Sequence, residues 1–478
     1  MTVRHFHVVL NSVGLIHIGN GKEYRKTDYF IDEGKLAVLD SKSFVSKLNH
    51  EQVDKFCNYL EDPTGKPRSE TGLEAFLKTD PGLRALAKES VAYRVDASLH
   101  KARRGSYQFY DVQEFIKDPY GKPYIPGSSV KGMLRTALLG YLILRERERF
   151  FQLYEEIPRD QKRKKGRELE KEAFQRSESV CDTTFDINIM RYISVADSLP
   201  LSTSDLVFAK KYDKFSIDDD VSHKKNMGRL SDDSYYAGNS LNIYRECLRP
   251  GTQIELTIDV DSRIDQYLGD LDLDVNGFRR ILEDSQDLYE RCFLRHFDLE
   301  GSHGAKSESA GKVDGRCRHV YQAGPLEGHR CRNQAIGDTG YCNMHQNVGQ
   351  DASKGSEIKK AICYLGGGVD FDSKTVINAL FEDDHERLDE IARILYGQFP
   401  TKVSTKLHQG LIDEIKDAMF IPQYMEPRYK GRRLIRGKDD HRHWKDIDLG
   451  VSPHTLKMGI WNNTTLPMGK CSFQIKEI

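Results

Sequence analysis

The sequence has no long hydrophobic run, few cysteines and no excess of either charge. No window of its 478 residues approaches the roughly 18 uninterrupted apolar residues of a membrane span, and Met1 to Leu10 lacks the apolar core of a signal peptide. We therefore expect a cytoplasmic protein without a membrane partner. Nine cysteines in so long a chain are too few for a disulfide framework and favour reduced thiols. The 72 basic and 73 acidic residues nearly cancel, so any nucleic-acid binding must depend on local basic patches.

Recognisable catalytic motifs are also missing. The sequence holds no Walker A sequence, no HExxH and no Ser-His-Asp order. No two carboxylates are spaced in a way that singles out a metal-dependent nuclease. The case for an enzyme rests on His17, which has the chemistry of a general acid or base for metal-independent RNA cleavage, and on single aspartates such as Asp28. A lone histidine beside a strand is more often structural, so we expect a protein that is not an enzyme.

Strand and helix patterns alternate irregularly along the chain. Arg4 to Leu10 is rich in β-branched and aromatic residues, and Gln253 to Val260 alternates polar with apolar residues, as in an antiparallel strand with one wet face. Helical spacing runs from Asp40 to Leu86, begins again at Val130, and returns from Asp270 to Phe293. An order without strict βαβα alternation predicts an α+β fold. A chain of this length exceeds a single hydrophobic core, which predicts at least two domains.

A glycine-rich segment follows the first predicted strand. Gly14, Gly19 and Gly21 would let backbone amides approach a phosphate closely, and Lys22 follows to supply charge. A tight hairpin that needs positive φ angles explains the same glycines. The sequence leaves both interpretations open.

The run IPGSSVKGMLRTALL, Ile125–Leu139, combines a turn, two serines and the apolar face of a helix. Ser128 or Ser129 is well placed as the helix N-cap, where hydroxyls and free amides favour an anion. Lys131 and Arg135 lie four residues apart on one helix face. The run predicts either an anion site or a capped surface helix whose basic residues stay solvated.

Three further glycines, Gly366, Gly367 and Gly368, precede a segment with helical spacing. Nearby Lys374 favours an anion contact at this loop. Three glycines before a helix also permit close packing of the backbone, which is the alternative explanation.

A basic stretch from Arg428 to Lys445 interleaves cations with Tyr429 and Trp444. Aromatic residues between cations suit a groove for single-stranded RNA, because bases stack on the rings while phosphates pair with the charges. Arg432 and Arg433 are its predicted RNA contacts. A solvated charged loop is the alternative.

Cys317, Cys331, Cys342 and His345 lie within about 30 residues of each other in a segment flanked by two linkers. Three thiolates and one imidazole satisfy the tetrahedral preference of zinc, and the i, i+3 pair at the end can ligate from one turn. The segment has few large apolar residues, so a metal would explain how it folds. We predict a structural zinc ion here. A close C-x2-C pair is absent, so His319 could substitute for one of the ligands. A disordered insertion with incidental cysteines is the alternative.

Several segments together resemble the RAMP superfamily of CRISPR effector proteins. The Ile125–Leu139 run resembles the superfamily signature. Other segments resemble the family of subunits that cap the Csm-type (type III-A) complex, the fifth subunit in its naming. These are spread in order over nearly the whole chain: Leu15–Tyr24, Val195–Ser198, Tyr244–Thr252, Tyr364–Thr375 and Ser452–Lys457.

The resemblance implies two tandem ferredoxin-like, RRM-type domains with helical insertions, over residues 1–260 and 261–478. The zinc-binding insertion, 315–346, would lie in the second domain and is not a usual part of the family. The implied function is a non-catalytic subunit that binds the 3′ part of the guide RNA (crRNA) and caps the filament of backbone RAMP subunits. It would assist guide-RNA maturation by host nucleases and contact other subunits of the Csm complex. By motif matching, guide phosphates would be faced by Lys131, Arg135 and the glycine turns at 19–21 and 366–368.

A RAMP endoribonuclease that processes the precursor guide RNA is the rival hypothesis. It would use His17 as its catalytic residue, with Tyr24 and Lys22 as helpers, and would need no metal ion.

Overall fold

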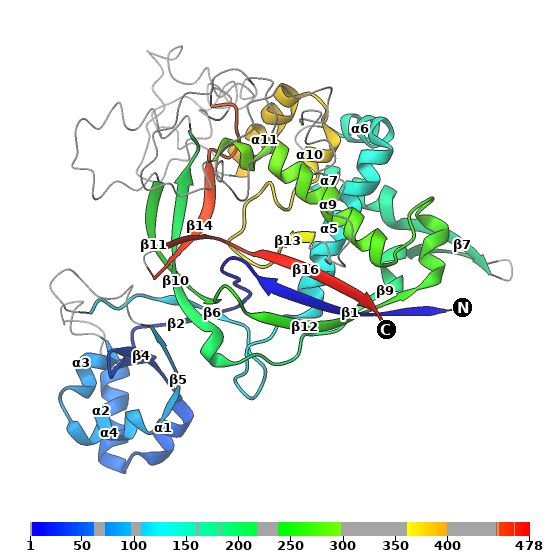
Figure 1. Cartoon of the computed structure of the whole chain (residues 1–478). Coiled ribbons are helices and arrows are strands. Elements are labelled where there is room, and N and C mark those ends of the chain that lie inside the picture. The colour runs from blue at the N-terminus through cyan, green and yellow to red at the C-terminus, as the bar shows by residue number, and fades with distance from the viewer. Residues whose placement is uncertain are drawn as a thin grey trace, which may run out of the picture. The chain divides into compact units, whose positions relative to one another are not determined.

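The first and last strands of the chain meet in one sheet of the computed structural model (Figure 1). The structure describes residues 2–61, 72–96, 107–158, 162–180, 183–217, 238–297, 361–398, 446, 449–462 and 464–478. All of them belong to one unit, Met1–Asp298 with Lys360–Ile478.

The first sheet carries the apolar alternation that the sequence predicted. In spatial order its strands are β13 (Ala361–Tyr364), β16 (Lys470–Glu477), β1 (Val3–Ser12), β12 (Gln253–Asp261) and β9 (Ile193–Val195). β1 is antiparallel to both neighbours, and Val8 lies between Leu256 and Ile475 in register. The predicted wet face of β12 is confirmed, because its polar positions are less buried than the apolar positions between them.

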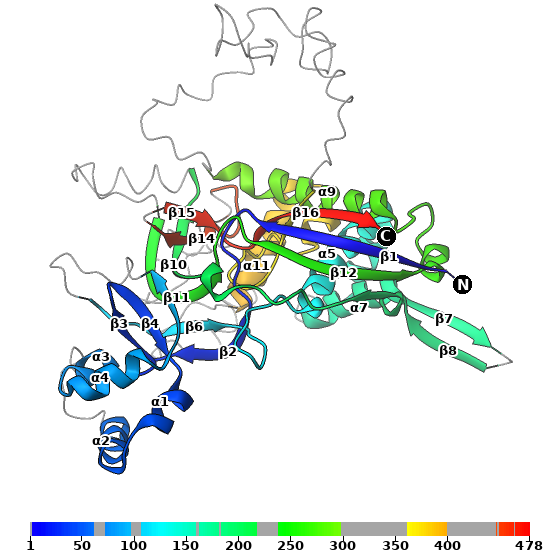
Figure 2. The same ribbon diagram turned by 60° about the horizontal axis from the view of Figure 1, so that its bottom comes forward.

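Two helices, α5 (Gly127–Arg145) and α9 (Val275–Cys292), contact each other and pack on one face of this sheet (Figure 2). The rings of Phe6 in β1 and Phe278 in α9 meet edge to face at 5.5 Å. The chain order β1, α5, β9, β12, α9, β16 and the sheet order β16, β1, β12, β9 are those of a ferredoxin-like fold. The predicted α+β class is confirmed.

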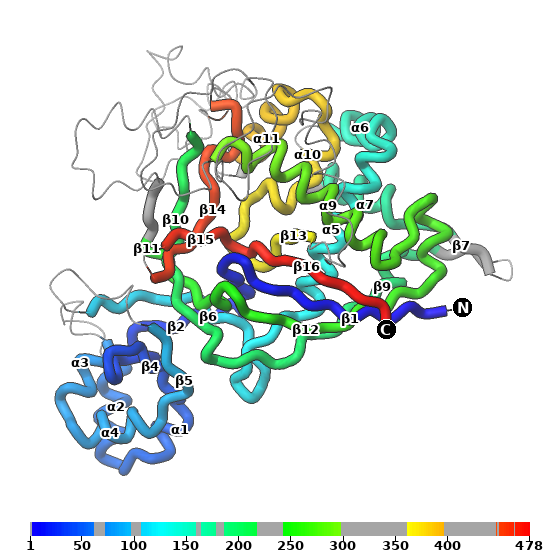
Figure 3. The backbone as a smooth tube through the Cα atoms, in the orientation of Figure 1, coloured from blue at the N-terminus to red at the C-terminus, as the bar shows by residue number. Residues whose placement is uncertain are grey.

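The second sheet also mixes strands from both ends of the chain. Its order is β15 (Thr464–Pro467), β14 (Thr455–Trp461), β10 (Leu206–Phe215), β11 (Gly238–Leu248), β6 (Val112–Phe115) and β2 (Gly19–Tyr24). The chain passes from β1 to β2 and from β14 through β15 to β16, so it crosses between the sheets at both ends (Figure 3).

The sheets do not divide at residue 260, where the sequence predicted a boundary between tandem domains. Both large sheets contain strands from either side of that position, because the C-terminal strands return to pair with β1 and with β10. The structure therefore does not confirm two tandem domains over 1–260 and 261–478. The proposed zinc insertion, 315–346, lies outside the described residues.

A helical insertion with its own core follows β2. It comprises β3 (Tyr29–Asp32), β4 (Lys35–Leu39), α1 (Ser41–Lys47), α2 (His50–Glu61), α3 (Leu73–Leu77), α4 (Pro81–Lys88) and β5 (Val91–Asp96). Phe30, Phe44 and Phe56 belong to its hydrophobic core. Asp40 and Asp80 cap α1 and α4 by accepting backbone N–H bonds. The predicted helical stretch is confirmed over its described part.

The remaining helices and strands of the described residues contact α5, α9 or one another. They are α6 (Arg147–Glu156), α7 (Lys162–Phe174), the hairpin of β7 (Gln175–Val180) and β8 (Thr183–Asn188), α10 (Ile377–Leu380) and α11 (Asp384–Gln398). None of the helices in the described ranges is long and apolar enough to cross a membrane.

Candidate nucleic-acid interface

A cleft of about 460 Å³ opens beside α5 and α9. The start of β2, strand β13 and the loop after β13 complete its wall. We call it the α5–α9 cleft, and we call residues 365–374 the glycine loop. The polar lining of the α5–α9 cleft consists of small hydroxyls, one amide, two tyrosines and one lysine: Ser128, Ser129, Thr136, Ser285, Ser373, Gln286, Tyr289, Tyr364 and Lys374.

Three segments that the sequence singled out separately meet in this cleft. Gly19 comes from the first glycine segment, Ser128 and Ser129 from the start of α5, and Gly366, Gly367 and Lys374 from the glycine loop. Lys374 Nζ donates to the backbone oxygen of Gly366 at 2.5 Å. Burial lowers the pKa of Lys374. The structure thus places a cation, hydroxyls and backbone around one opening, which suits an anionic polymer with neutral bases.

The glycine loop is held by its own acidic residues. Asp370 Oδ1 accepts the backbone N–H of Lys457 at 2.8 Å, and its Oδ2 accepts the Tyr289 hydroxyl at 3.0 Å. Asn378 Nδ2 donates to Asp372 Oδ1 at 3.2 Å. Burial raises the pKa of Asp370 to about 7. The loop therefore joins α9, β14 and the cleft.

Close packing explains why this loop needs glycine. Gly366 has a φ of +90°, and a Cβ there would lie 2.3 Å from the backbone oxygen of His17. The Gly367 N–H donates to that same oxygen at 2.6 Å. A Cβ on Gly368, whose φ is +79°, would lie 3.0 Å from Nη1 of Arg245. The packing interpretation holds, and the phosphate contact stays a prediction.

The start of α5 differs from the prediction of a serine cap. Pro126 is the N-cap residue, so Ser128 and Ser129 lie in the first turn. The cap prediction was wrong because the carboxylate of Asp197, 70 residues away, accepts the Gly127 N–H at 2.7 Å. A Cβ on Gly127 would lie 2.2 Å from the Val195 oxygen. Distant residues thus occupy the position that the sequence assigned to a local serine.

Lys131 and Arg135 are absent from the lining of the α5–α9 cleft. Arg135 Nη2 lies 2.6 Å from Glu170 Oε2, and its guanidinium lies over the Phe174 ring. Partial burial lowers the pKa of Lys131, and the neighbouring Arg135 adds to this effect. The contact of Lys131 and Arg135 with guide phosphates stays a prediction. For Arg135, the partly exposed Glu170 would compete with a phosphate.

The first glycine segment forms strand β2, paired with β6 through a register shift between Gly19 and Glu23. Gly21 has a φ of +82° with open space around it. Lys22 is exposed and donates its backbone N–H to Asn20 Oδ1 at 2.8 Å. A bulged edge strand therefore replaces the tight hairpin of the alternative interpretation.

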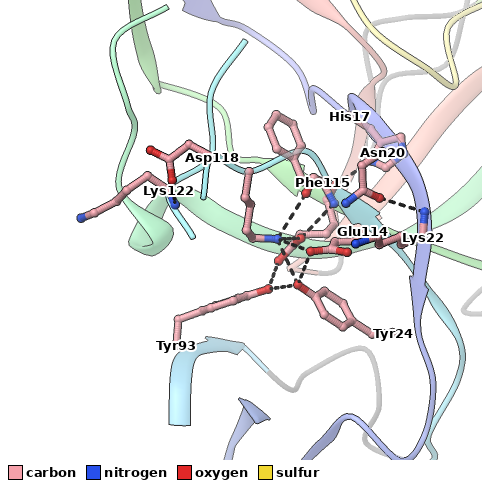
Figure 4. Close-up of polar contacts among 11 residues, drawn as sticks. His17, Asn20, Lys22, Tyr24, Tyr93, Glu114, Phe115, Asp118 and Lys122 are labelled. Carbon is pink, nitrogen blue, oxygen red and sulfur yellow. Dashed lines mark hydrogen bonds and ion pairs between the residues drawn. The ribbon is translucent and has the colours of Figure 1, made fainter. Parts of the chain in front are cut away.

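His17 is buried, with only 5% of its surface exposed. Its ring lies near the ring of Phe115 (Figure 4). Its Nδ1 lies 2.7 Å from the backbone oxygen of Glu246. Burial lowers the His17 pKa to about 4, and the charges of Arg245 and Lys117 add to this effect. The imidazole is therefore neutral at pH 7, but its burial gives a substrate little access. These are the features of a structural histidine.

Beside His17, the structure reveals a buried polar cluster that sequence reasoning missed. The Glu246 side chain is fully buried, and burial raises its pKa. Lys117 Nζ lies 2.6 Å from Glu246 Oε2 and 3.1 Å from the Tyr24 hydroxyl. Tyr93 of the helical insertion donates to Glu246 and is hydrogen-bonded to Tyr24 (Figure 4). A glutamate within an apolar strand pattern was the available signal. We call these residues the Glu246 cluster.

The open face of the first sheet is poorly suited to nucleic acid. RRM-type domains stack bases on aromatic residues of this face. Here His5 pairs with Asp259 at 2.8 Å, and His7 pairs with Glu255 at 3.3 Å. Carboxylates repel phosphates, which favours the α5–α9 cleft over the sheet face.

Several predicted site residues lie outside the described residues. These are Arg432 and Arg433 of the basic stretch and the proposed zinc ligands Cys317, Cys331, Cys342 and His345. Within the described ranges, no group of three or more His, Cys, Asp or Glu side chains could hold a metal ion.

Comparison with known proteins decides the family. The family model described as RAMP superfamily matches residues 13–272, which is more than half of the chain. The chain belongs to the RAMP superfamily. The match contains β2, α5 and the Glu246 cluster, and ends before the glycine loop.

The similar RAMP proteins carry one name. The CRISPR system Cms protein Csm5 of Streptococcus thermophilus is 26% identical over 280 residues, which cover 56% of this chain and 68% of that protein. The protein of the same name from Mycobacterium tuberculosis (strain CDC 1551 / Oshkosh) is 27% identical over 285 residues, covering 54% and 66%. The matches thus span about two thirds of these relatives.

Among solved structures, a chain of a CRISPR complex is similar to this chain in fold. It is a chain of the cryo-EM structure of a Csm-crRNA-target RNA ternary complex in a type III-A CRISPR-Cas system. It aligns with a TM-score of 0.52 at 16% identity and covers 99% of this chain and 100% of that chain. This likeness shows the fold alone.

Proposed function

We propose that this RAMP protein is a non-catalytic subunit of a type III-A CRISPR RNA-guided complex. In this role it binds the 3′ part of the guide RNA, caps the filament of backbone RAMP subunits and assists guide-RNA maturation. Its partners are the guide RNA, the backbone subunit, other Csm subunits and host nucleases. The names of the relatives and the composition of the similar complex support this assignment.

The α5–α9 cleft is the observation that carries RNA binding. Lys374 offers a charge to a phosphate, the hydroxyls of Ser128 and Ser129 offer neutral donors, and Tyr364 offers a ring against which a base can stack. A cleft of about 460 Å³ has the size of a small-ligand site, which is suited to one or two nucleotides of a longer strand. The rest of the strand would continue over neighbouring surfaces.

Binding to single-stranded RNA tests the proposal. The purified full chain should bind a labelled oligonucleotide of about 20 nucleotides, and the logarithm of its affinity should fall linearly with the logarithm of salt concentration. The RNA should remain uncut. Absence of binding at low salt would contradict the proposal.

The rival function is a metal-independent endoribonuclease that uses His17, Tyr24 and Lys22. The neutral state of His17 at pH 7 favours a base, whereas its burial disfavours contact with a substrate. Precursor guide RNA incubated with the pure protein in a chelator distinguishes the two functions. Specific cleavage that disappears in His17→Ala would replace the scaffold function by the enzymatic one.

We also propose that Cys317, Cys331, Cys342 and His345 hold one structural zinc ion. The count and type of these ligands support the proposal. Metal analysis of the purified protein should find about one zinc per chain, and the double variant Cys331→Ser, Cys342→Ser should lose it. Less than about half an equivalent, or unchanged zinc in the variant, would contradict the site.

A further inference from the structure

Three cations lie on one face of the second sheet, next to the part of the glycine loop that does not line the α5–α9 cleft. They are Lys211 in β10, Arg245 in β11 and Lys457 in β14. The strands are neighbours in the order β14, β10, β11. Lys457 is paired with Asp213, and Arg245 with Ala209, each two residues from Lys211. The three cations therefore lie on neighbouring strands in a diagonal order, with a register shift between β10 and β11 at Lys211.

The anions beside these cations do not match them. Among the described residues, Asp213 is the carboxylate that forms ion pairs with both lysines: it lies 3.5 Å from Lys211 Nζ and 3.1 Å from Lys457 Nζ. The buried Asp370 lies close to Lys457, but burial raises its pKa to about 7. Arg245 Nε donates to the neutral Gln113 at 2.8 Å, and its Nη atoms have no hydrogen-bond partner within the described ranges. Burial lowers the pKa of Lys211, and the charges of Lys457 and Arg245 add to this effect. Such crowding is costly, and a bound anion would relieve it.

The cluster remains open to a ligand. The lysine side chains of Lys211 and Lys457 keep 20% and 28% of their surface exposed. Partial burial already restricts both side chains, which limits the entropy they lose on binding a ligand.

The glycine loop connects this cluster to the cleft. Gly366, Gly367 and Lys374 line the cleft, while Gly368 approaches Arg245 and Asp370 accepts the backbone N–H of Lys457. The loop thus contacts the cleft through Gly366, Gly367 and Lys374, and the three-cation cluster through Gly368 and Asp370.

We propose that Lys211, Arg245 and Lys457 form a second RNA site, which holds backbone phosphates of the strand that occupies the α5–α9 cleft. This inference rests on the proposed function and adds the direction in which the strand leaves the cleft. As a set of phosphate contacts, the site would position the strand without selecting its sequence.

The test compares two triple variants of equal charge. One carries Lys211→Gln, Arg245→Gln and Lys457→Gln. The control carries Lys35→Gln, Lys55→Gln and Lys476→Gln, three lysines that are exposed elsewhere on the protein. For a 20-nucleotide single-stranded RNA, the slope of log affinity against log salt should shrink by about 2 in the first variant, since each phosphate contact contributes about 0.7. The control should keep the wild-type slope.

Two further measurements keep the outcome unambiguous. Arg245→Lys retains the charge and should keep the wild-type slope, whereas Arg245→Gln should lose about 0.7. If the triple variant melts early, the three single variants replace it. If the variants keep the wild-type slope of log affinity against log salt and Lys374→Ala still weakens binding, the second site is wrong and the proposed function stands. Absence of RNA binding by the wild-type protein overturns the proposed function and the second site together.

Discussion

The α5–α9 cleft and the Glu246 cluster both contain residues that contact His17, and they use their polar groups differently. In the Glu246 cluster a buried carboxylate is satisfied by Lys117, Tyr93 and the Phe115 N–H. In the cleft, Lys374 has one backbone oxygen as its hydrogen-bond partner among the described residues, and the neighbouring hydroxyls line an opening. A fully hydrogen-bonded buried network stabilises the fold, whereas donors that line an opening can bind a ligand.

Among the changes considered, removal of Lys117 from the Glu246 cluster should have the largest effect on stability. Lys117→Met leaves Glu246 buried without its counter-charge and should lower the free energy of unfolding by about 4 kcal/mol, measured by denaturant titration. The double variant Lys117→Met, Glu246→Met should recover most of that loss. A loss below about 1 kcal/mol would show that the pair contributes little.

Replacement of Asp370 in the glycine loop should change how the free energy of unfolding depends on pH. The raised pKa of about 7 means that the protonated form is favoured in the folded state, so this stabilisation is present below about pH 4 and is lost as the pH rises to about 7. Asp370→Asn removes the charge; its oxygen can still accept the Lys457 N–H, and its amide nitrogen can donate to the Tyr289 hydroxyl. Relative to the wild type, the variant should gain on the order of 4 kcal/mol between these pH values. A pH-independent difference in denaturant titrations would refute the buried charge.

Gly366→Ala tests the contact that joins the cleft to His17. A Cβ 2.3 Å from the His17 oxygen, at a φ of +90°, should cost about 3 kcal/mol in thermal or denaturant unfolding. Gly121→Ala is the matched control: its φ is +78° in open space, so only the backbone strain of about 1 kcal/mol remains. Equal losses at both positions would mean that the loop tolerates the side chain.

Lys374→Ala should weaken RNA binding at the α5–α9 cleft while changing stability least. The variant should bind single-stranded RNA about 10-fold more weakly, or about 1.4 kcal/mol, while its unfolding midpoint stays near that of the wild type. Lys35→Ala, in the helical insertion, is the control and should bind normally. Unchanged affinity in Lys374→Ala would remove the cation from the site.

The local patterns of the sequence predicted individual elements well. The strand at 4–10, the alternation at 253–260 and the helix starting near Val130 are all present, because each depends on residues a few positions apart. The sequence also singled out segments that meet in the cleft. Their meeting was predictable only through family resemblance.

Long-range contacts account for what the sequence did not predict. β16 returns to pair with β1, so strands from both sides of residue 260 share one sheet. Asp197 takes the place of a serine cap on α5. Lys211, Arg245 and Lys457 come together only after three strands pair, since nothing local distinguishes them from solvated charges. Lys131 and Arg135, chosen for their helical spacing, lie outside the cleft lining.

The most direct measurement of the central claim is ultraviolet crosslinking of bound single-stranded RNA, with the attached peptides identified by mass spectrometry. We expect crosslinks in the first turns of α5 and in residues 362–374, where Tyr364 faces the cleft. Crosslinks confined to the open face of the first sheet, at His5 and His7, would contradict it.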